Sequence, residues 1–503
     1  MEKIRRKIFF WTLVIIFFIV APAIILNARG YRFDSTRGVF VYSGTVTIKS
    51  NPQTVDLSLN GQPASGQVSR INSSNNLSGL LPGNYEIVAS LPGYRPWTKE
   101  TDVHSGVASE FWNVMLVREN YTVTNYDTAA GIDKFFISPK NKFIAYSKNS
   151  DGLKIGILNI ASKITESEFP IDGWNLMADA KKENIEWSPN EDYISVPVEK
   201  EIAEKETVKK KTSIATTSPT KTQYAYFVIN PAEKNIFNLN EFLGKDSIQD
   251  ARWDPKNKDY LFFLEGQSLW RANITNKDDL TLISDNVAGY DLSGSSVYWI
   301  QTPNNLVLKS ALDGTYKSQI TNDFPGSSDI PVNKIIVYDK TRVGLINANK
   351  DLFIYNEGEK ETYFRKIGSD VESLAFSDDG KKMLFWSGNE IFVYFVRNWD
   401  VQPVRAENDL TSITRYSEKI ENVQWSKDYE HVIFNTGQWV KAIELDGRDH
   451  RNCMDLISTE NSGSFIRYNN SLEYLFFTDK SGDRNILKSI IFPEPTPILG
   501  IGG

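Results

Sequence analysis

Thiol and imidazole side chains are nearly absent from this chain. Its 503 residues include one cysteine, Cys453, and three histidines, His104, His431 and His450. A single cysteine cannot form an intramolecular disulfide, so cysteine pairing does not indicate a compartment, and zinc sites built from several thiolates are excluded. The histidines lie far apart in the sequence and none has the HExxH spacing of a metalloprotease helix. The sequence therefore predicts no metal site.

An excess of positive charge is also missing. Lys and Arg number 56 against 63 Asp and Glu, which leaves a net charge of -7. Binding to a phosphate backbone needs a basic surface, so nucleic acid is excluded as a partner. The chain has no GxSxG nucleophile motif and no glycine-rich phosphate loop. Acidic turns such as Ser377-Asp378-Asp379-Gly380 lack the spacing of a calcium loop. We therefore expect no catalytic, cofactor-binding or metal-binding residues.

The first feature that is present is one long hydrophobic run, from Ile8 to Leu26, without a charged residue. It is long enough to cross a bilayer, because it would span about 28 Å as a helix against a hydrocarbon core of roughly 30 Å. Four basic residues precede the run and two follow it: Lys3, Arg5, Arg6 and Lys7, then Arg29 and Arg32. The positive-inside rule then predicts a cytoplasmic tail and transmembrane helix over residues 1–30, with the remaining chain outside the cytoplasm in a single-pass cell-membrane protein. A cleaved signal peptide is the alternative, because Ala21-Pro22-Ala23 resembles a cleavage site.

A small β-domain is predicted over residues 44–118, after a linker at 31–43. Apolar and polar residues alternate in Thr45-Val46-Thr47-Ile48 and in Val55-Asp56-Leu57-Ser58-Leu59, as in half-buried strands. Asn60-Gly61 and Leu81-Pro82-Gly83-Asn84 have the chemistry of tight turns between strands. These patterns predict an antiparallel sandwich.

The same segment resembles the PEGA domain family of surface and membrane-anchored microbial proteins. The matching residues are Ser50-Asn51-Pro52, Asn60-Gly61, Leu81-Pro82-Gly83-Asn84-Tyr85 and Pro92-Gly93-Tyr94. The family's name motif is degraded here, since Gln53-Thr54-Val55 follows Pro52. The resemblance implies a β-sandwich and names no ligand. Generic turns of any sandwich are the alternative interpretation.

A repeated unit fills residues 119–493. Each unit has an aromatic or aliphatic residue, a polar turn and then an apolar strand, as in Phe136-Ile137-Ser138-Pro139 before FIAYS and Trp187-Ser188-Pro189 before YISVPV. The turns fall near positions 138, 188, 254, 293, 338, 377, 426 and 469. Periods of about 40 to 50 residues are typical of the four-stranded blades of a β-propeller. The chain is therefore predicted to be all-β after its helix, with eight blades favoured over seven.

The unit resembles the TolB-like class of propeller repeat, in which a W/F-S-P-D-G turn joins the innermost strand of a blade to the next. Trp253-Asp254-Pro255, Phe376-Ser377-Asp378-Asp379-Gly380 and Trp425-Ser426-Lys427 carry this resemblance. One spacing is longer than the others because of a Lys- and Thr-rich run, predicted as a mobile hairpin insertion at 199–222. Residues 494–503 are predicted to be a C-terminal tail.

Closure of the ring needs one more strand. The last unit has room for two strands after its turn, EYLFFTD and NILKSIIF, before the proline-containing tail. We expect Asn120 to Tyr126 to supply the outer strand of the last blade, which would leave no open blade edge.

These features predict a non-enzymatic, surface-anchored binding or scaffold protein that presents a propeller to a protein or glycan ligand. The alternative is a hydrolase or lyase whose active site lies in the propeller channel, assembled from distant blades. Trp187, Trp253 and Trp425 occupy the same place in successive repeats and are expected in the core. Trp97 is outside any repeat and is a slightly better candidate for a surface contact, but packing is the favoured interpretation for it too.

Overall fold

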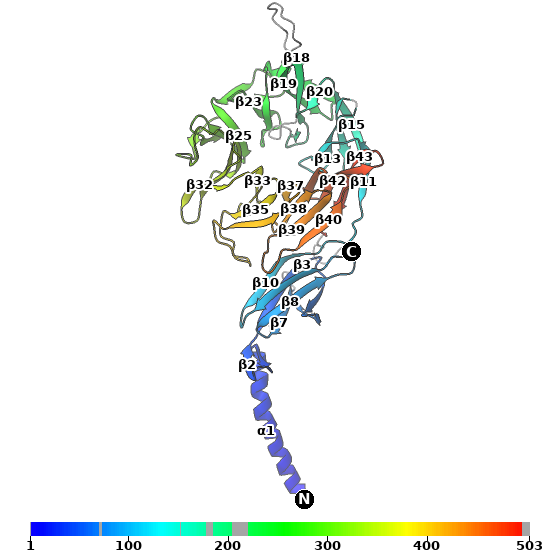
Figure 1. Ribbon diagram of the computed structural model, residues 1–503, viewed down its shortest axis with the longest axis vertical. Coiled ribbons are helices and arrows are strands. Elements are labelled where there is room, and N and C mark those ends of the chain that lie inside the picture. The colour runs from blue at the N-terminus through cyan, green and yellow to red at the C-terminus, as the bar shows by residue number, and fades with distance from the viewer. Residues whose placement is uncertain (1, 70–72, 151, 178–184, 204–219, 495–503) are drawn as a thin grey trace, which may run out of the picture.

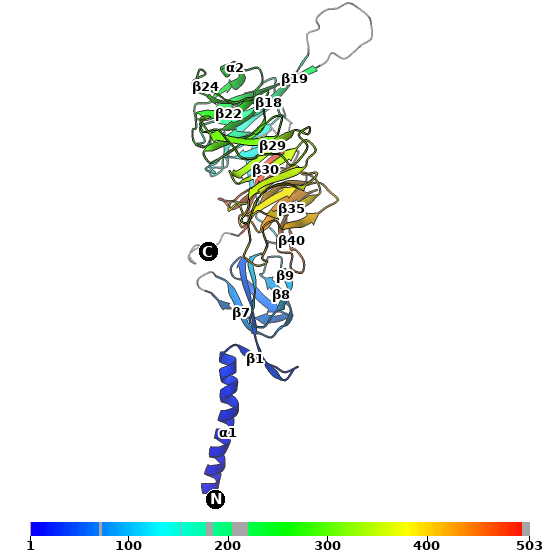
Figure 2. The same ribbon diagram turned by 90° about the vertical axis from the view of Figure 1, so that its left-hand side faces the viewer.

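The computed structural model describes residues 2–69, 73–150, 152–177, 185–203 and 220–494. It consists of an N-terminal helix, a short β-hairpin, a small sandwich and a large ring of β-sheets (Figure 1). Turning the molecule by 90° shows the helix, the sandwich and the ring following one another along the long axis (Figure 2). This order agrees with the predicted fold class, which is all-β apart from an N-terminal apolar helix.

Helix α1 (Glu2–Ala28) is 27 residues long and contains Pro22. Its length is about 40 Å at the usual helical rise. Within the part from Ile4 to Ala28, an 18-residue stretch has a mean hydropathy of 2.8, and none of that stretch is buried against the rest of the described chain. The helix is therefore long and apolar enough to cross a membrane, and a signal sequence would have the same properties.

The segment predicted as a linker forms a two-stranded hairpin of β1 (Tyr31–Asp34) and β2 (Val39–Tyr42). The Asp34 carboxylate accepts hydrogen bonds from the backbone N–H groups of Thr36 and Arg37, which fixes the turn. The hairpin lies between the end of α1 and the sandwich in both views (Figures 1 and 2).

The sandwich contains two four-stranded sheets. One has the order β10 (Ala108–Met115), β3 (Gly44–Asn51), β7 (Asn75–Leu80) and β6 (Gln67–Val68), and the other has the order β5 (Gln62–Ala64), β4 (Asp56–Leu59), β8 (Gly83–Ser90) and β9 (Trp97–Val103). The expectation of a purely antiparallel sandwich is wrong, because β10 pairs with β3 in parallel. Val46, Ile48, Ile87 and Phe111 fill the space between the sheets.

Eight sheets follow, each with its strands in chain order from the channel outward except for the last. The first blade contains β12 (Lys134–Ile137), β13 (Phe143–Lys148), β14 (Leu153–Asn159) and β15 (Ile164–Ile171), and the second contains β16 (Asn175–Leu176), β17 (Glu186–Trp187), β18 (Ile194–Ala203), β19 (Thr220–Asn230) and β20 (Asn235–Asn238). The third blade contains β21 (Gln249–Trp253), β22 (Tyr260–Glu265), β23 (Ser268–Asn273) and β24 (Leu280–Ser284), and the fourth contains β25 (Val287–Ser293), β26 (Ser296–Gln301), β27 (Leu306–Ala311) and β28 (Ser318–Gln319). A short helix, α2 (Leu239–Leu243), follows β20.

The fifth blade contains β29 (Val332–Asp339), β30 (Arg342–Asn347), β31 (Leu352–Glu357) and β32 (Thr362–Gly368), and the sixth contains β33 (Ser373–Phe376), β34 (Lys382–Trp386), β35 (Glu390–Phe395) and β36 (Leu410–Arg415). The seventh blade contains β37 (Ile420–Trp425), β38 (His431–Thr436), β39 (Trp439–Glu444) and β40 (Cys453–Ser458), and the eighth contains β41 (Ile466–Asn469), β42 (Tyr474–Ser481), β43 (Arg484–Ile491) and β11 (Thr124–Ala130). The structure is thus an eight-bladed propeller, as favoured from the repeat spacing.

The ring is closed by the predicted pairing of its two ends. β11 pairs with β43 as the outermost strand of the last blade, with Thr124 opposite Ser489 and Tyr126 opposite Leu487. It begins at Thr124 and continues to Ala130, a few residues later than expected. Buried apolar clusters lie between every pair of neighbouring blades, including one that joins Phe135 of the first blade to Phe476 of the last.

In the turn that recurs in the repeats, a buried polar side chain accepts hydrogen bonds from backbone N–H groups that have no backbone acceptor. Ser138 accepts hydrogen bonds from the N–H groups of Lys142 and Phe143, and Ser377 accepts one from Lys382. Asp254 does the same for Lys256 and Asn257. The polar turn residues are therefore fully buried for a structural reason, since buried backbone donors must be paired.

The insertion predicted as a hairpin at 199–222 continues the two strands of the second blade where it is described. β18 and β19 continue as an antiparallel pair up to Ala203 and Thr220, so residues 199–203 and 220–222 are strand. Residues 204–219 and 495–503 lie outside the described part of the chain, and most of the predicted tail is among them.

A buried ion pair attaches the sandwich to the seventh blade. Lys99 Nζ lies 2.7 Å from Glu444 Oε1, and the two side chains are 0% and 4% exposed. Trp97 Nε1 donates to the other oxygen of Glu444 at 2.9 Å. Arg448 packs its guanidinium 4.1 Å from the ring centre of Phe111. Removing one partner of a buried pair leaves an uncompensated charge and costs about 3–5 kcal/mol, so substitutions at this joint should destabilise it strongly.

Next to this joint, His431 forms a pH-sensitive contact. Its ring is fully buried and Nδ1 lies 2.7 Å from Asp428 Oδ2. Burial alone would favour the neutral ring, but the carboxylates of Asp428, Glu444 and Glu430 outweigh it and raise the pKa of His431. The pair therefore contributes stability that is fully present below the unfolded pKa of about 6.5 and is lost as pH rises through the folded pKa.

We predict that His431→Gln destabilises the protein most at acidic pH. The difference in unfolding free energy from the wild type should shrink as pH rises above about 6.5 and through the raised pKa of His431 in the folded protein, because deprotonation removes the same charge in the wild type. Urea unfolding of the full chain in detergent at several pH values measures it, with His104→Gln on the exposed turn after β9 as control. A difference that does not change with pH would contradict the assignment.

Candidate functional site

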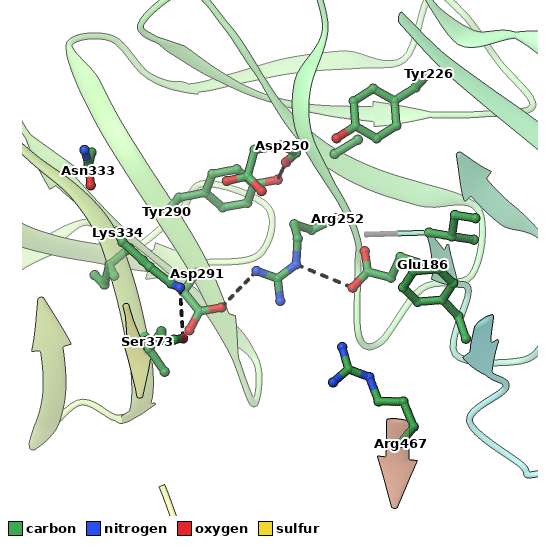
Figure 3. A pocket seen from close by; sticks show the side chains of 15 residues that line it. Glu186, Tyr226, Asp250, Arg252, Tyr290, Asp291, Asn333, Lys334, Ser373 and Arg467 are labelled. Atoms are coloured by element: carbon green, nitrogen blue, oxygen red, sulfur yellow. Dashed lines mark hydrogen bonds and ion pairs between the residues drawn. The ribbon is translucent and has the colours of Figure 1, made fainter. Parts of the chain in front are cut away.

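The candidate site is a cavity of about 540 Å³ in the channel of the propeller. Its lining comes from the innermost strands of seven blades, with Tyr226 from β19 in addition. The residues on the innermost strands include Phe136, Glu186, Asp250, Arg252, Tyr290, Asp291, Lys334, Ser373 and Arg467. The volume is in the range of small-ligand pockets. Figure 3 shows acidic and basic side chains facing one another across this space.

Arg252 is at the centre of the charged residues and joins three blades. Its Nε lies 3.4 Å from Glu186 Oε1 in the second blade, and its Nη1 lies 3.3 Å from Asp291 Oδ1 in the fourth (Figure 3). The Glu186, Arg252 and Asp291 side chains are 31%, 38% and 11% exposed. They are open to the cavity but already paired with one another.

Both carboxylates have a second contact, which ties one blade to the next. Glu186 Oε2 accepts the backbone N–H of Trp253 at 3.0 Å, and Asp291 Oδ2 accepts that of Val337 at 2.8 Å. The seventh blade has the same contact with an uncharged side chain, because Gln424 Oε1 accepts the N–H of Tyr468 at 2.9 Å. The contact therefore requires an acceptor oxygen and no ionisable group.

The repeated tryptophans supply a parallel set of ties. The indole Nε1 of Trp187 donates to Phe136 O, that of Trp253 to Glu186 O and that of Trp425 to Ala375 O, each in the preceding blade. All three rings are buried. The prediction that they belong to the core is confirmed. Trp97 is also buried, which agrees with the favoured core interpretation and not with the surface-contact alternative, and its indole N–H donates to Glu444 at the joint between sandwich and propeller.

The channel changes the protonation behaviour of its side chains. Burial raises the pKa of Glu186 and of Asp291, and Arg252 and backbone donors reduce but do not cancel the rise. Burial would lower the pKa of Arg252, but the carboxylates of Glu186 and Asp291 outweigh it and raise the pKa. Burial also raises the pKa of the Tyr290 phenol well above its ordinary value. Arg252 and Tyr290 therefore stay protonated at neutral pH.

An unusual backbone conformation in the channel also has a structural explanation. Asp250 has a positive φ of 49°, which is uncommon for a residue other than glycine. It falls at an irregularity in the pairing of β21 with β22, between Gln249 and Arg252. Asn422 has a φ of 51° at the same kind of irregularity in β37. Recurrence in two blades indicates a bulge that belongs to the repeat and not to a reactive centre.

Further cations come from the other side of the cavity. Lys334 Nζ donates to Ser373 Oγ at 2.9 Å, which connects the fifth and sixth blades (Figure 3). Arg467 in β41 carries its guanidinium 4.7 Å from the ring centre of Phe465 and points into the cavity (Figure 3). The channel thus contains both signs of charge, and its chemistry suits binding of polar or charged groups.

The scarce residues noted in the sequence do not meet in the channel. His431 and His450 lie near the joint with the sandwich, His104 is on the surface of the sandwich, and the Cys453 thiol lies 3.4 Å from the Tyr416 hydroxyl in the seventh blade. Among the described residues, no group of three or more metal-ligating side chains is found. The acidic turns at 254 and 378 are β-turns, with Asp254 paired to Arg271.

The lining residues were missed because no local motif marks them. A usable signal was present: the lining residues Glu186, Arg252 and Arg467 each stand one position before the aromatic residue of a repeat. Since side chains alternate along a strand, a residue beside a buried aromatic faces the channel. Asp291 and Lys334 are outside this rule, because their repeats have lost the aromatic residue.

Comparisons with known proteins give similarity of fold only. No family model matches the chain, and no curated protein matches it. Similar solved structures include the Cps50 (Swd1) β-propeller domain of Myceliophteria thermophila, at 11% identity over 74% of this chain and 98% of that chain, with a TM-score of 0.37. The Dos1 propeller has 11% identity over 74% and 95%, with a TM-score of 0.46. Dipeptidyl peptidase 4 of Porphyromonas gingivalis has 12% identity over 71% and 57%, with a TM-score of 0.44.

The tie made by Glu186 leads to a stability prediction. Glu186→Ala leaves the N–H of Trp253 without its acceptor and should cost about 1–3 kcal/mol. Glu186→Gln keeps an acceptor oxygen and loses only a partly exposed ion pair, which is worth about 1 kcal/mol or less. Chemical unfolding of the full chain in detergent compares them, and Gln424→Ala is the matched control that removes the same tie without a charge. Equal losses for the Gln and Ala variants of Glu186 would contradict this role.

Proposed function

We propose that this protein is a non-enzymatic, membrane-anchored binding or scaffold protein that presents its propeller to a protein partner outside the cytoplasm. One observation carries the proposal. The two best-placed channel carboxylates, Glu186 and Asp291, already hold a guanidinium and a backbone N–H each, and Gln424 makes the same backbone contact in another blade. Carboxylates with these contacts are better suited to holding the blades together than to transferring protons.

The anchor in this proposal is α1. Its apolar surface is unburied and four basic residues precede its apolar core, which supports a cytoplasmic N-terminus and an extracytoplasmic C-terminal part. The buried pair of Lys99 and Glu444 makes the sandwich a rigid spacer between helix and ring. We propose PEGA-like and TolB-like ancestry for sandwich and propeller, on the turn residues that carry those resemblances.

A protein partner is favoured over a glycan by the nature of the exposed surface. The β18–β19 hairpin extends the second blade beyond the other sheets (Figure 2), and it carries Ile202, which is 42% exposed. The cavity contains both signs of charge, as peptide termini and side chains do. A glycan ligand remains the second possibility from sequence and is separated by the binding experiment below.

A channel enzyme is the alternative, and one observation favours it. Glu186 and Asp291 face a cavity of about 540 Å³ with raised pKa values, and such carboxyls are common in hydrolase active sites. This alternative requires that one of the two exchanges its structural contacts for a substrate during turnover.

The proposal predicts no hydrolytic turnover by the full chain in nanodiscs against panels of peptides, esters and glycans. It also predicts saturable binding of an extracellular protein or peptide that survives Glu186→Gln, because the variant keeps the blade tie. Glu233→Gln, on an exposed turn, is the matched control. Turnover that is lost in Glu186→Gln or Asp291→Asn but kept in the control would establish the enzyme instead. Binding confined to the glycan panel would show the partner class to be wrong.

A further inference from the structure

The hairpin between helix and sandwich has an aromatic face whose tip is exposed in the described part of the chain. Tyr31 is opposite Tyr42 and Phe33 is opposite Phe40, so all four rings share one face of the two strands. The ring centres of Tyr31 and Tyr42 are 5.2 Å apart, and those of Phe33 and Phe40 are 5.3 Å apart. Phe33 is 55% exposed, Phe40 41% and Tyr42 45%.

The other face of the hairpin is attached to the protein. Arg32 Nη1 donates to the carbonyl oxygens of Asn27 in α1 and Tyr31, both at 3.0 Å. The guanidinium also lies against Gly79 of the sandwich, where an added Cβ would be 3.0 Å from it. At the base of the hairpin, the Tyr42 ring lies so close to Gly106 that an added Cβ would be 2.8 Å away. The Arg32 contacts on the opposite face and the Tyr42 contact at the base therefore fix the direction in which the tip with Phe33 and Phe40 points.

The position of the hairpin along the chain determines what can cover this face. β1 begins three residues after α1 ends. A helix that spans the hydrocarbon core places the next few residues at the boundary between acyl chains and headgroups, where aromatic residues concentrate in membrane proteins. Arg29, between α1 and β1, and Arg37, in the hairpin turn, are exposed, and Arg37 lies 3.5 Å from Asp34 in an ion pair. Guanidinium groups at this depth match the phosphate groups of lipids.

A two-stranded hairpin is marginally stable in water on its own, so an aromatic face without a core needs a further partner. We infer that the β1–β2 hairpin is a membrane-interface anchor, which inserts Phe33 and Phe40 among the lipids of the outer leaflet and so limits how far the sandwich and propeller can tilt. This inference depends on the proposed transmembrane role of α1. It goes beyond that role, because a helix alone fixes depth and leaves orientation free.

Spin labels on single cysteines test the inference in the full chain. Cys453→Ser removes the native thiol, and the label is placed by Phe40→Cys on the aromatic face or by Val39→Cys on the opposite face of the same strand. Val39 is 49% exposed, so it is a matched control. Phe17→Cys reports the middle of α1, and Leu282→Cys, 42% exposed on the third blade, reports bulk water. The probe is collision with oxygen, which dissolves in lipid, and with a water-soluble nickel chelate, in nanodiscs of phosphatidylcholine and phosphatidylglycerol.

The ratio of oxygen to nickel accessibility at position 40 should fall between those at positions 17 and 282, and should exceed that at position 39 several-fold. A label at 40 as water-accessible as the one at 282, with 17 in lipid, would overturn the anchor while leaving the membrane span intact. A label at 40 shielded from both reagents and broadened by a second label would show a second copy of the chain covering this face instead. A water-accessible label at 17 would refute the span itself.

Discussion

The last blade of this propeller is complete only when a strand from the start of the ring pairs with the sheet at its end. Here β11 meets this constraint by pairing with β43, and the apolar cluster of Phe135 and Phe476 seals the junction. The position of the sandwich depends on the same strand, because β10 ends at Met115 and β11 begins at Thr124. Met115 and Val117 pack among residues of the last two blades. Closing the ring therefore also holds the sandwich against it.

Within the ring, charged side chains in the channel connect one blade to the next. Glu186 and Asp291 join successive blades through backbone N–H groups, and Arg252 forms an ion pair with both. Such residues have the raised pKa values expected of functional groups, yet the occurrence of Gln424 in the same contact shows that the acceptor oxygen is sufficient. A perturbed carboxyl in a propeller channel is for this reason weak evidence for catalysis.

The fold was largely predictable because its signals are local and repeated. The turn residues Ser138, Ser188 and Ser377 recur with the period of a blade, and the unpaired last blade required a strand from the start of the propeller. The parallel pairing of β3 with β10 was not predictable, because it joins segments distant in sequence and no turn marks it. The hairpin at 31–42 was missed because its aromatic residues alternate over only four positions per strand. The channel is formed by single residues from separate blades, so it could be located only through their shared position beside the buried aromatics.

Hydrogen exchange of the full chain in nanodiscs tests ring closure most directly. The amides of β11 should exchange as slowly as those of β24 or β36, which are outer strands of ordinary blades, and the neighbouring β43 should be protected on both sides. Strand pairing in a cooperative core makes exchange depend on large-scale opening. Exchange of β11 at the rate of an exposed turn such as 231–234, with β43 losing protection along its outer side, would show that the ring is open and contradict this account.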